Sequence, residues 1–99
     1  MPGLNPTDQT DASASAHAGQ NIATSSTPAN FASAPALHGV EVCAPAANSA
    51  PIYVGLANTV AVGTGLEIAA GQSKFIRVAN ANMIWVVSAA AQNARALST

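Results

Sequence analysis

From residue 37 onward, hydrophobic and polar residues alternate with the period of two that half-buried β-strands require. The alternation is clear over 40–43 and again over 52–54. The stretch 83–88 is apolar at nearly every position, which is typical of a central strand covered on both faces. Segments rich in Gly, Asn and Pro separate these stretches. The pattern therefore predicts several short strands joined by turns.

Weaker patterns add further strands. Residues 59–62 and 66–68 flank a Gly-Thr-Gly turn and predict a hairpin, and 73–79 and 92–97 predict two more strands. We therefore expect an all-β fold, a small β-sandwich or barrel of about six or seven short antiparallel strands spanning 37–99. Its predicted core consists of Val40, Val42, Ile52, Val54, Ile76, Val78, Ile84, Trp85 and Val86.

The first 36 residues have a different composition. They contain nine Ala, five Ser and four Thr, with a short helix conceivable over 8–18. This composition predicts an extended low-complexity arm over 1–36, ahead of a domain over 37–99. Leu4, Ile22 and Phe31 are the large apolar residues of the arm after Met1, and we expect them to anchor it on a neighbouring protein.

Charge narrows the range of partners. Charged residues are only 7% of the chain, whereas a soluble small domain carries roughly 25–35% on its surface. Much of this surface is therefore expected to meet other protein. The net charge is -1 and the three basic residues are spread apart, so we expect no nucleic-acid partner. The longest apolar run is too short to span a membrane, and we expect no membrane partner.

Few residues of the chain have side chains suited to catalysis or metal binding. The candidates are His17, His38, Cys43 and four carboxylates. In a strand, Glu41 and Cys43 point to one face and His38 points to the other, so these three do not converge on a metal. We therefore expect no catalytic residue, no cofactor and no metal, and no enzymatic activity.

The sequence also raises the question of whether two aromatic residues are buried and whether one pair of charged residues interacts. Tyr53 and Trp85 form either part of the core or an aromatic platform for a ligand, and the apolar neighbours of Trp85 favour burial. An exposed Trp85 would favour ligand binding. Arg77 is expected to pair with Glu67 across neighbouring strands.

Four segments together resemble a small β-sandwich module of tailed-bacteriophage virion proteins. They are Ala-Pro-Ile-Tyr-Val-Gly at 50–55, Val-Gly-Thr-Gly-Leu-Glu-Ile-Ala-Ala-Gly-Gln-Ser at 62–73, Ile-Arg-Val at 76–78 and Ile-Trp-Val-Val-Ser-Ala-Ala at 84–90. In the module, a strand ending in Tyr-Val-Gly is followed by a Gly-rich turn, a Leu-x-x-Ala-Gly-x-Ser step and a closing hydrophobic strand.

The resemblance implies a head decoration or cement protein, made in the host bacterial cytoplasm and placed on the capsid surface of the virion. Its implied partners are the major capsid protein and further copies of itself, as a homotrimer near capsid three-fold positions. The alternative is a head-fibre or tail component whose β-module binds a receptor or glycan. The loops at Asn58 and 80–82 would then join Tyr53 and Trp85 in contacting the ligand.

Overall fold

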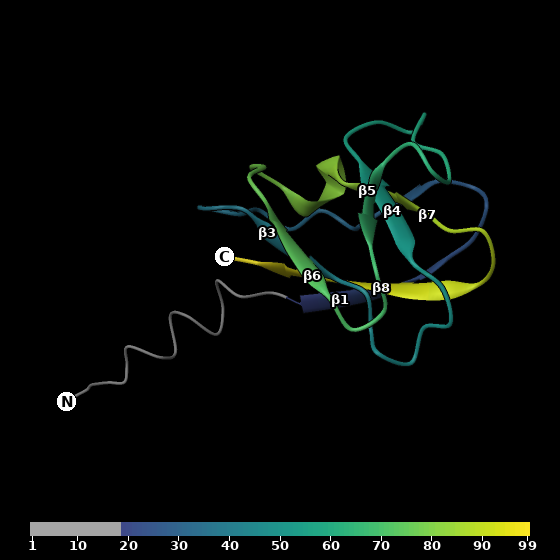
Figure 1. Ribbon diagram of the computed structural model, residues 1–99. Coiled ribbons are helices and arrows are strands. Elements are labelled where there is room, and N and C mark those ends of the chain that lie inside the picture. The colour runs from purple at the N-terminus through teal and green to yellow at the C-terminus, as the bar shows by residue number, and fades with distance from the viewer. Residues whose placement is uncertain (1–18) are drawn as a thin grey trace.

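The computed structural model describes residues 19–99, which form two antiparallel four-stranded sheets. Sheet A has the strand order β1-β8-β3-β6 and sheet B the order β2-β7-β4-β5. The strands are β1 (Gly19–Thr24), β2 (Ala29–Asn30), β3 (Val40–Cys43), β4 (Ile52–Gly55), β5 (Leu66–Ile68), β6 (Ser73–Ile76), β7 (Trp85–Val87) and β8 (Gln92–Ser98), with a 3-10 turn η1 (Ala81–Met83) before β7. In Figure 1 the yellow β8 runs beside the purple β1.

The core lies where the inward faces of the two sheets meet. Alternate residues of β3, β4 and β8 are buried, as the sequence pattern requires. The inward residues of β8 include two alanines, whereas β3 and β4 contribute Val and Ile. The buried cluster comprises Phe31, Ala34, Val40, Val42, Ala44, Ile52, Val54, Ile68, Ala81, Ile84, Val86, Ala94 and Ala96. The all-β class with short antiparallel strands is thereby confirmed.

Residues 19–36 belong to the sandwich, so the expected boundary between arm and domain at residue 36 is wrong. All six residues of β1 pair with β8, and β2 pairs with β7. Phe31 is 1% exposed and sits in the core. An edge strand needs only a few apolar groups on one side, which explains why its Ala, Ser and Thr content resembled that of an arm. Residues 1–18, with Leu4 and the helix considered over 8–18, lie outside the described residues.

The hairpin expected over 59–68 also differs. Residues 59–62 form no strand and belong to a loop over 56–65, across which β5 pairs with β4. Val60 folds back over the glycines at both ends of this loop. A Cβ atom added at Gly65 would lie 2.7 Å from Cγ2 of Val60, and one at Gly55 would lie 3.0 Å from the same side chain. The glycines therefore favour a compact loop where alternation predicted a strand.

The expected pairing of Glu67 with Arg77 across neighbouring strands is wrong as well. Glu67 lies on β5 in sheet B, and Arg77 follows directly after β6 in sheet A. Strands in different sheets share no ladder, so the two residues are not cross-strand neighbours.

Polar side chains tie the loops to the strands. Thr24 and Ser88 share a buried hydroxyl hydrogen bond of 2.7 Å that joins the end of β1 to the end of β7. Within residues 19–99, every buried side-chain nitrogen or oxygen atom has a hydrogen-bond partner. The small core is therefore not weakened by unsatisfied polar groups, each of which would cost about 1–3 kcal/mol.

The position of Phe31 generates a stability prediction. Phe31→Ala removes a buried ring and should lower the free energy of unfolding by about 3–5 kcal/mol, as measured by urea denaturation followed by circular dichroism. Leu37→Ala is the control, because Leu37 is 87% exposed and should be replaceable with little change. Equal stability of the two variants would contradict the assignment of Phe31 to the core.

Candidate functional site on the outer face of sheet A

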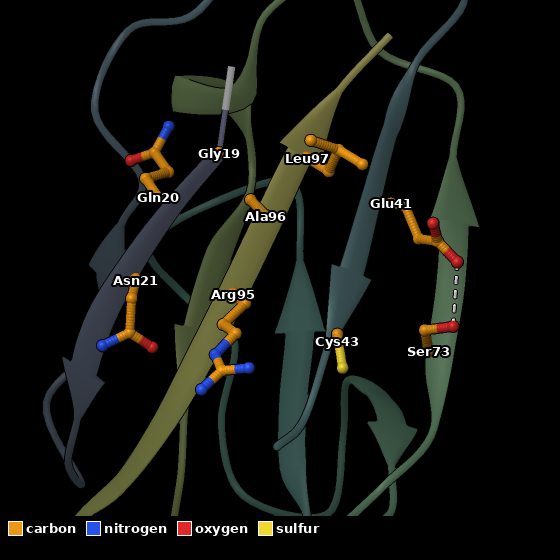
Figure 2. A pocket seen from close by; sticks show the side chains of 9 residues that line it. All are labelled: Gly19, Gln20, Asn21, Glu41, Cys43, Ser73, Arg95, Ala96 and Leu97. Atoms are coloured by element: carbon orange, nitrogen blue, oxygen red, sulfur yellow. Dashed lines mark hydrogen bonds between the residues drawn. The ribbon is translucent and has the colours of Figure 1, made fainter. Parts of the chain in front are cut away.

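The outer face of sheet A is built from two cross-strand rows. Antiparallel register places Asn21, Arg95, Cys43 and Ser73 opposite one another across β1, β8, β3 and β6. Figure 2 shows these four side chains side by side. The adjacent row contains Gly19, Leu97, Glu41 and Phe75. Directly opposed residues have Cβ atoms about 4.5–5.5 Å apart, so each row is a continuous strip of side chains. We call these eight residues the sheet A outer face.

An open depression of about 590 Å³ lies over this face. Its walls include Gly19, Leu97, Arg95 and Cys43. At the β1 edge the first row begins with an asparagine and the second with a glycine, so the larger side chains stand on the middle strands β8 and β3 and, through Phe75, on the opposite edge strand β6. The depression is therefore a broad sheet surface and not an enclosed pocket.

One basic and one acidic group occupy different rows of the sheet A outer face. The exposed Arg95 has Asn21 and Cys43 as its direct cross-strand neighbours. Glu41 is exposed opposite Leu97, and its Oε2 accepts a hydrogen bond of 2.9 Å from Oγ of Ser73. Figure 2 shows this bond at the β6 side of the face. The serine thus orients the carboxylate, while the guanidinium stands one row away.

Two large apolar side chains share this surface with the charges. Leu97 is 36% exposed and Phe75 is 53% exposed. The ring of Phe75 lies against the backbone at Gly39, since a Cβ atom added there would lie 2.6 Å from Cζ of Phe75. This close approach fixes the ring at the edge of the sheet. The face therefore presents ordered apolar groups to solvent, which is typical of a contact surface.

The residues considered for catalysis or metal binding do not converge. Glu41 and Cys43 share the sheet A outer face, as alternation predicted. His38 is exposed in the loop before β3, where its backbone N–H donates to the carbonyl of Thr99 at 2.8 Å. His17 lies outside the described residues. Within residues 19–99, no group of three His, Cys, Asp or Glu side chains is placed to hold a metal ion.

The structure places the predicted core residues in three groups. Val40, Val42, Ile52, Val54, Ile84 and Val86 are buried, and Ile76 and Val78 are half-buried against the core cluster. Trp85 differs, because it is half-buried and points away from the core. Its cross-strand neighbours Asn30 and Gly55 share the outer face of sheet B with it. Alternation places Trp85 on the face of β7 opposite to that of the inward Val86, and Val87, on the same face as Trp85, is only 1% exposed.

Among the predicted anchors, Phe31 is wrongly assigned as a capsid contact, because its ring lies in the core. Ile22 is half-buried and packs against the same core cluster. Leu4 lies outside the described residues.

Sequence reasoning missed a second apolar surface at the loop between β4 and β5. Leu56, Val62 and Leu66 are 62%, 43% and 47% exposed there. We call residues 56–66 the β4–β5 loop tip. The alternation over 59–62 concealed it by suggesting a strand with one buried side.

A side-chain clamp at the rim of the site generates the next prediction. Oε1 of Gln20 accepts a bond of 2.8 Å from the Ala32 N–H, and its Nε2 donates one of 3.0 Å to the Ala32 carbonyl. Gln20→Ala should therefore lower the free energy of unfolding by about 1–3 kcal/mol. The adjacent, exposed Asn21 provides the control, as Asn21→Ala should stay within about 0.5 kcal/mol of the natural protein. Thermal denaturation measures both, and an unchanged Gln20→Ala variant would contradict the clamp.

Comparison with known proteins identifies no family for this chain. In the described part of the chain, no helix is long and apolar enough to cross a membrane. No protein-family model matches the chain, and no match is found among curated proteins or among solved structures.

Proposed function

We propose that this protein is a non-enzymatic structural component of a tailed-bacteriophage virion, which decorates the capsid and stabilises it as a cement protein. The supporting observation is a folded domain that exposes large apolar side chains on separate surfaces while carrying few charges. In this proposal the protein is made in the host bacterial cytoplasm and then binds the major capsid protein at the outer surface of the shell.

Surface composition is the first argument for this proposal. Within residues 19–99, seven large apolar residues are substantially exposed, and only 7% of the whole chain is charged. A free-standing small domain usually keeps apolar patches few and charges many, because this preserves solubility. The observed surface suits a protein that is bound to other proteins when it functions. The exposed residues are Leu37, Leu56, Val62, Leu66, Phe75, Met83 and Leu97.

The segments that resemble the phage module coincide with strands of the sandwich, which also supports the proposal. The segment 50–55 contains β4, 62–73 contains β5 and leads into β6, and 84–90 contains β7. These strands make up most of sheet B and one edge of sheet A. The resemblance therefore concerns the framework of the sandwich and includes no catalytic motif.

The N-terminal residues provide the proposed capsid contact. With 19–36 folded into the sandwich, residues 1–18 precede the domain, and they include Leu4. Eighteen residues span at most about 60 Å when fully extended, which is enough to reach a neighbouring capsid subunit. Weak contacts of this kind add up when many copies bind a repeating shell. The homotrimer implied by the resemblance is part of the same proposal.

Co-sedimentation with undecorated capsids tests this function. The full chain should bind saturably, and a chain beginning at Gly19 should lose most of the binding while remaining folded. Leu4→Ser in the full chain should weaken binding by about ten- to a hundredfold, as expected when a buried leucine contact worth about 1.5–3 kcal/mol is lost.

Leu37→Ser is the matched control, because this leucine is exposed and lies within the domain. Binding of the full chain that does not saturate, or no binding at all, would contradict a capsid role. Binding that is equally strong without residues 1–18 would instead move the capsid contact to the β-domain.

The alternative of a fibre or tail module that binds glycans depends on Trp85, which is half-buried. The ring shares the outer face of sheet B with Asn30. Trp85 is the single tryptophan of the chain, so its fluorescence reports on that face. For a cement protein we expect no saturable change of emission on titration with bacterial surface glycans. A saturable change that Trp85→Phe removes would favour the glycan-binding alternative.

A further inference from the structure

We infer that the sheet A outer face is a self-association surface on which two copies of this protein pack face to face around a two-fold axis. The inference concerns contacts between copies and does not depend on a capsid partner. It follows from the charges, the apolar side chains and the dimensions of this face.

Charge complementarity is the main argument. In a two-fold contact the same patch meets itself, so each residue i that touches j is repeated as j touching i. Arg95 and Glu41 stand in adjacent rows on the neighbouring strands β8 and β3. An axis that passes between them brings Arg95 of each copy over Glu41 of the other. The face contributes one basic and one acidic side chain, so both charges are matched without a third partner.

The arrangement of apolar and small residues fits the same contact. Leu97 lies on β8, one of the two middle strands of sheet A, and Phe75 lies on the edge strand β6. The β1 edge presents Gly19 and Asn21 in the corresponding rows. Packed sheets lie about 10 Å apart, a gap that Leu, Phe and Arg side chains from both sides fill. Two copies would thus form a four-layer stack of sheets.

Charge also favours a second copy of this face over the two other parts of the chain that could cover it, the β4–β5 loop tip and residues 1–18. The β4–β5 loop tip contains no charged residue, so it leaves both Arg95 and Glu41 without a partner. The segment 1–18 contains Asp8 and Asp11, which would match Arg95 but would bring like charge to Glu41. A second copy of the same face satisfies both groups.

The dimensions of the face set the strength of the contact. The strands of sheet A have four to seven residues and lie about 4.8 Å apart, so together they cover about 340 Å². A standard stable interface buries about 800 Å² on each partner, so this dimer belongs with the weak, transient class. We expect a monomer–dimer equilibrium that depends on concentration in the micromolar range or above. A two-fold contact closes after two copies and is therefore separate from the implied three-fold assembly.

Analytical ultracentrifugation of the full chain over a wide concentration range tests the inference. The natural protein should show a reversible monomer–dimer equilibrium. Arg95→Glu and Glu41→Arg should each weaken dimerisation by about tenfold or more, because each places like charges opposite one another. The double variant exchanges the two charges and should restore dimerisation. This rescue separates a direct contact from a loss of folding.

Two leucine substitutions, one in the face and one outside it, form a matched test and control for the dimer contact. Leu97→Glu should abolish the dimer, whereas Leu37→Glu, in an exposed position outside the face, should leave it unchanged. Cys43 is the single cysteine of the chain and lines the depression. A short bismaleimide should therefore join two chains through Cys43, and Cys43→Ser should remove the product.

Three results would overturn the inference. They are a monomer at every concentration, a dimer indifferent to the Arg95 and Leu97 substitutions, and a double charge variant that fails to recover. None of these bears on capsid co-sedimentation through residues 1–18, so the self-contact and the proposed function fail independently.

Discussion

The register of β8 is the constraint on which both the core and the outer surface depend. This strand pairs with β1 on one side and β3 on the other, and its residues are alternately buried and exposed along its whole length. Ala94 and Ala96 face the core, while Arg95 and Leu97 face solvent. A slip by one residue would exchange the two sets. It would bury a guanidinium without a partner, which makes the observed register strongly preferred.

Side-chain and backbone hydrogen bonds hold that register at both ends of β8. Asn48 forms two bonds with the backbone of Asn93, donating to its carbonyl at 2.8 Å and accepting from its N–H at 3.1 Å. At the other end, the carbonyl of Thr99 accepts backbone bonds from Leu37 and His38. Each contact joins residues far apart in sequence. The loop after β3 and the segment before β3 therefore lock the C-terminal strand from opposite ends.

The dependence on distant contacts explains which parts of the fold were predictable. Strands β3 and β4 were identified locally by their alternation, and β7 by the continuous apolar run in which it lies. β1 has the sequence Gly-Gln-Asn-Ile-Ala-Thr, in which a single large apolar residue carries the pattern. Such a strand forms because β8 supplies its ladder, and no local propensity reveals that partner. Phe31, a lone aromatic in a polar stretch, was the available indication that this region reaches the core.

The same reasoning separates the predictable half of the candidate site from the rest. Glu41 and Cys43 lie two residues apart on one strand, so alternation alone placed them on one face. Arg95 and Leu97 join them through the pairing of β3 with β8, which sequence periodicity does not specify.

On a face with so few charges, the placement of each one affects orientation more than affinity, because matched charges add little net energy while opposed like charges cost several kcal/mol. A second copy packed about a two-fold axis that runs through both groups would bring Arg95 opposite Arg95 and Glu41 opposite Glu41. The spacing of this pair therefore favours one geometry of contact from among the many that Leu97 and Phe75 alone would allow.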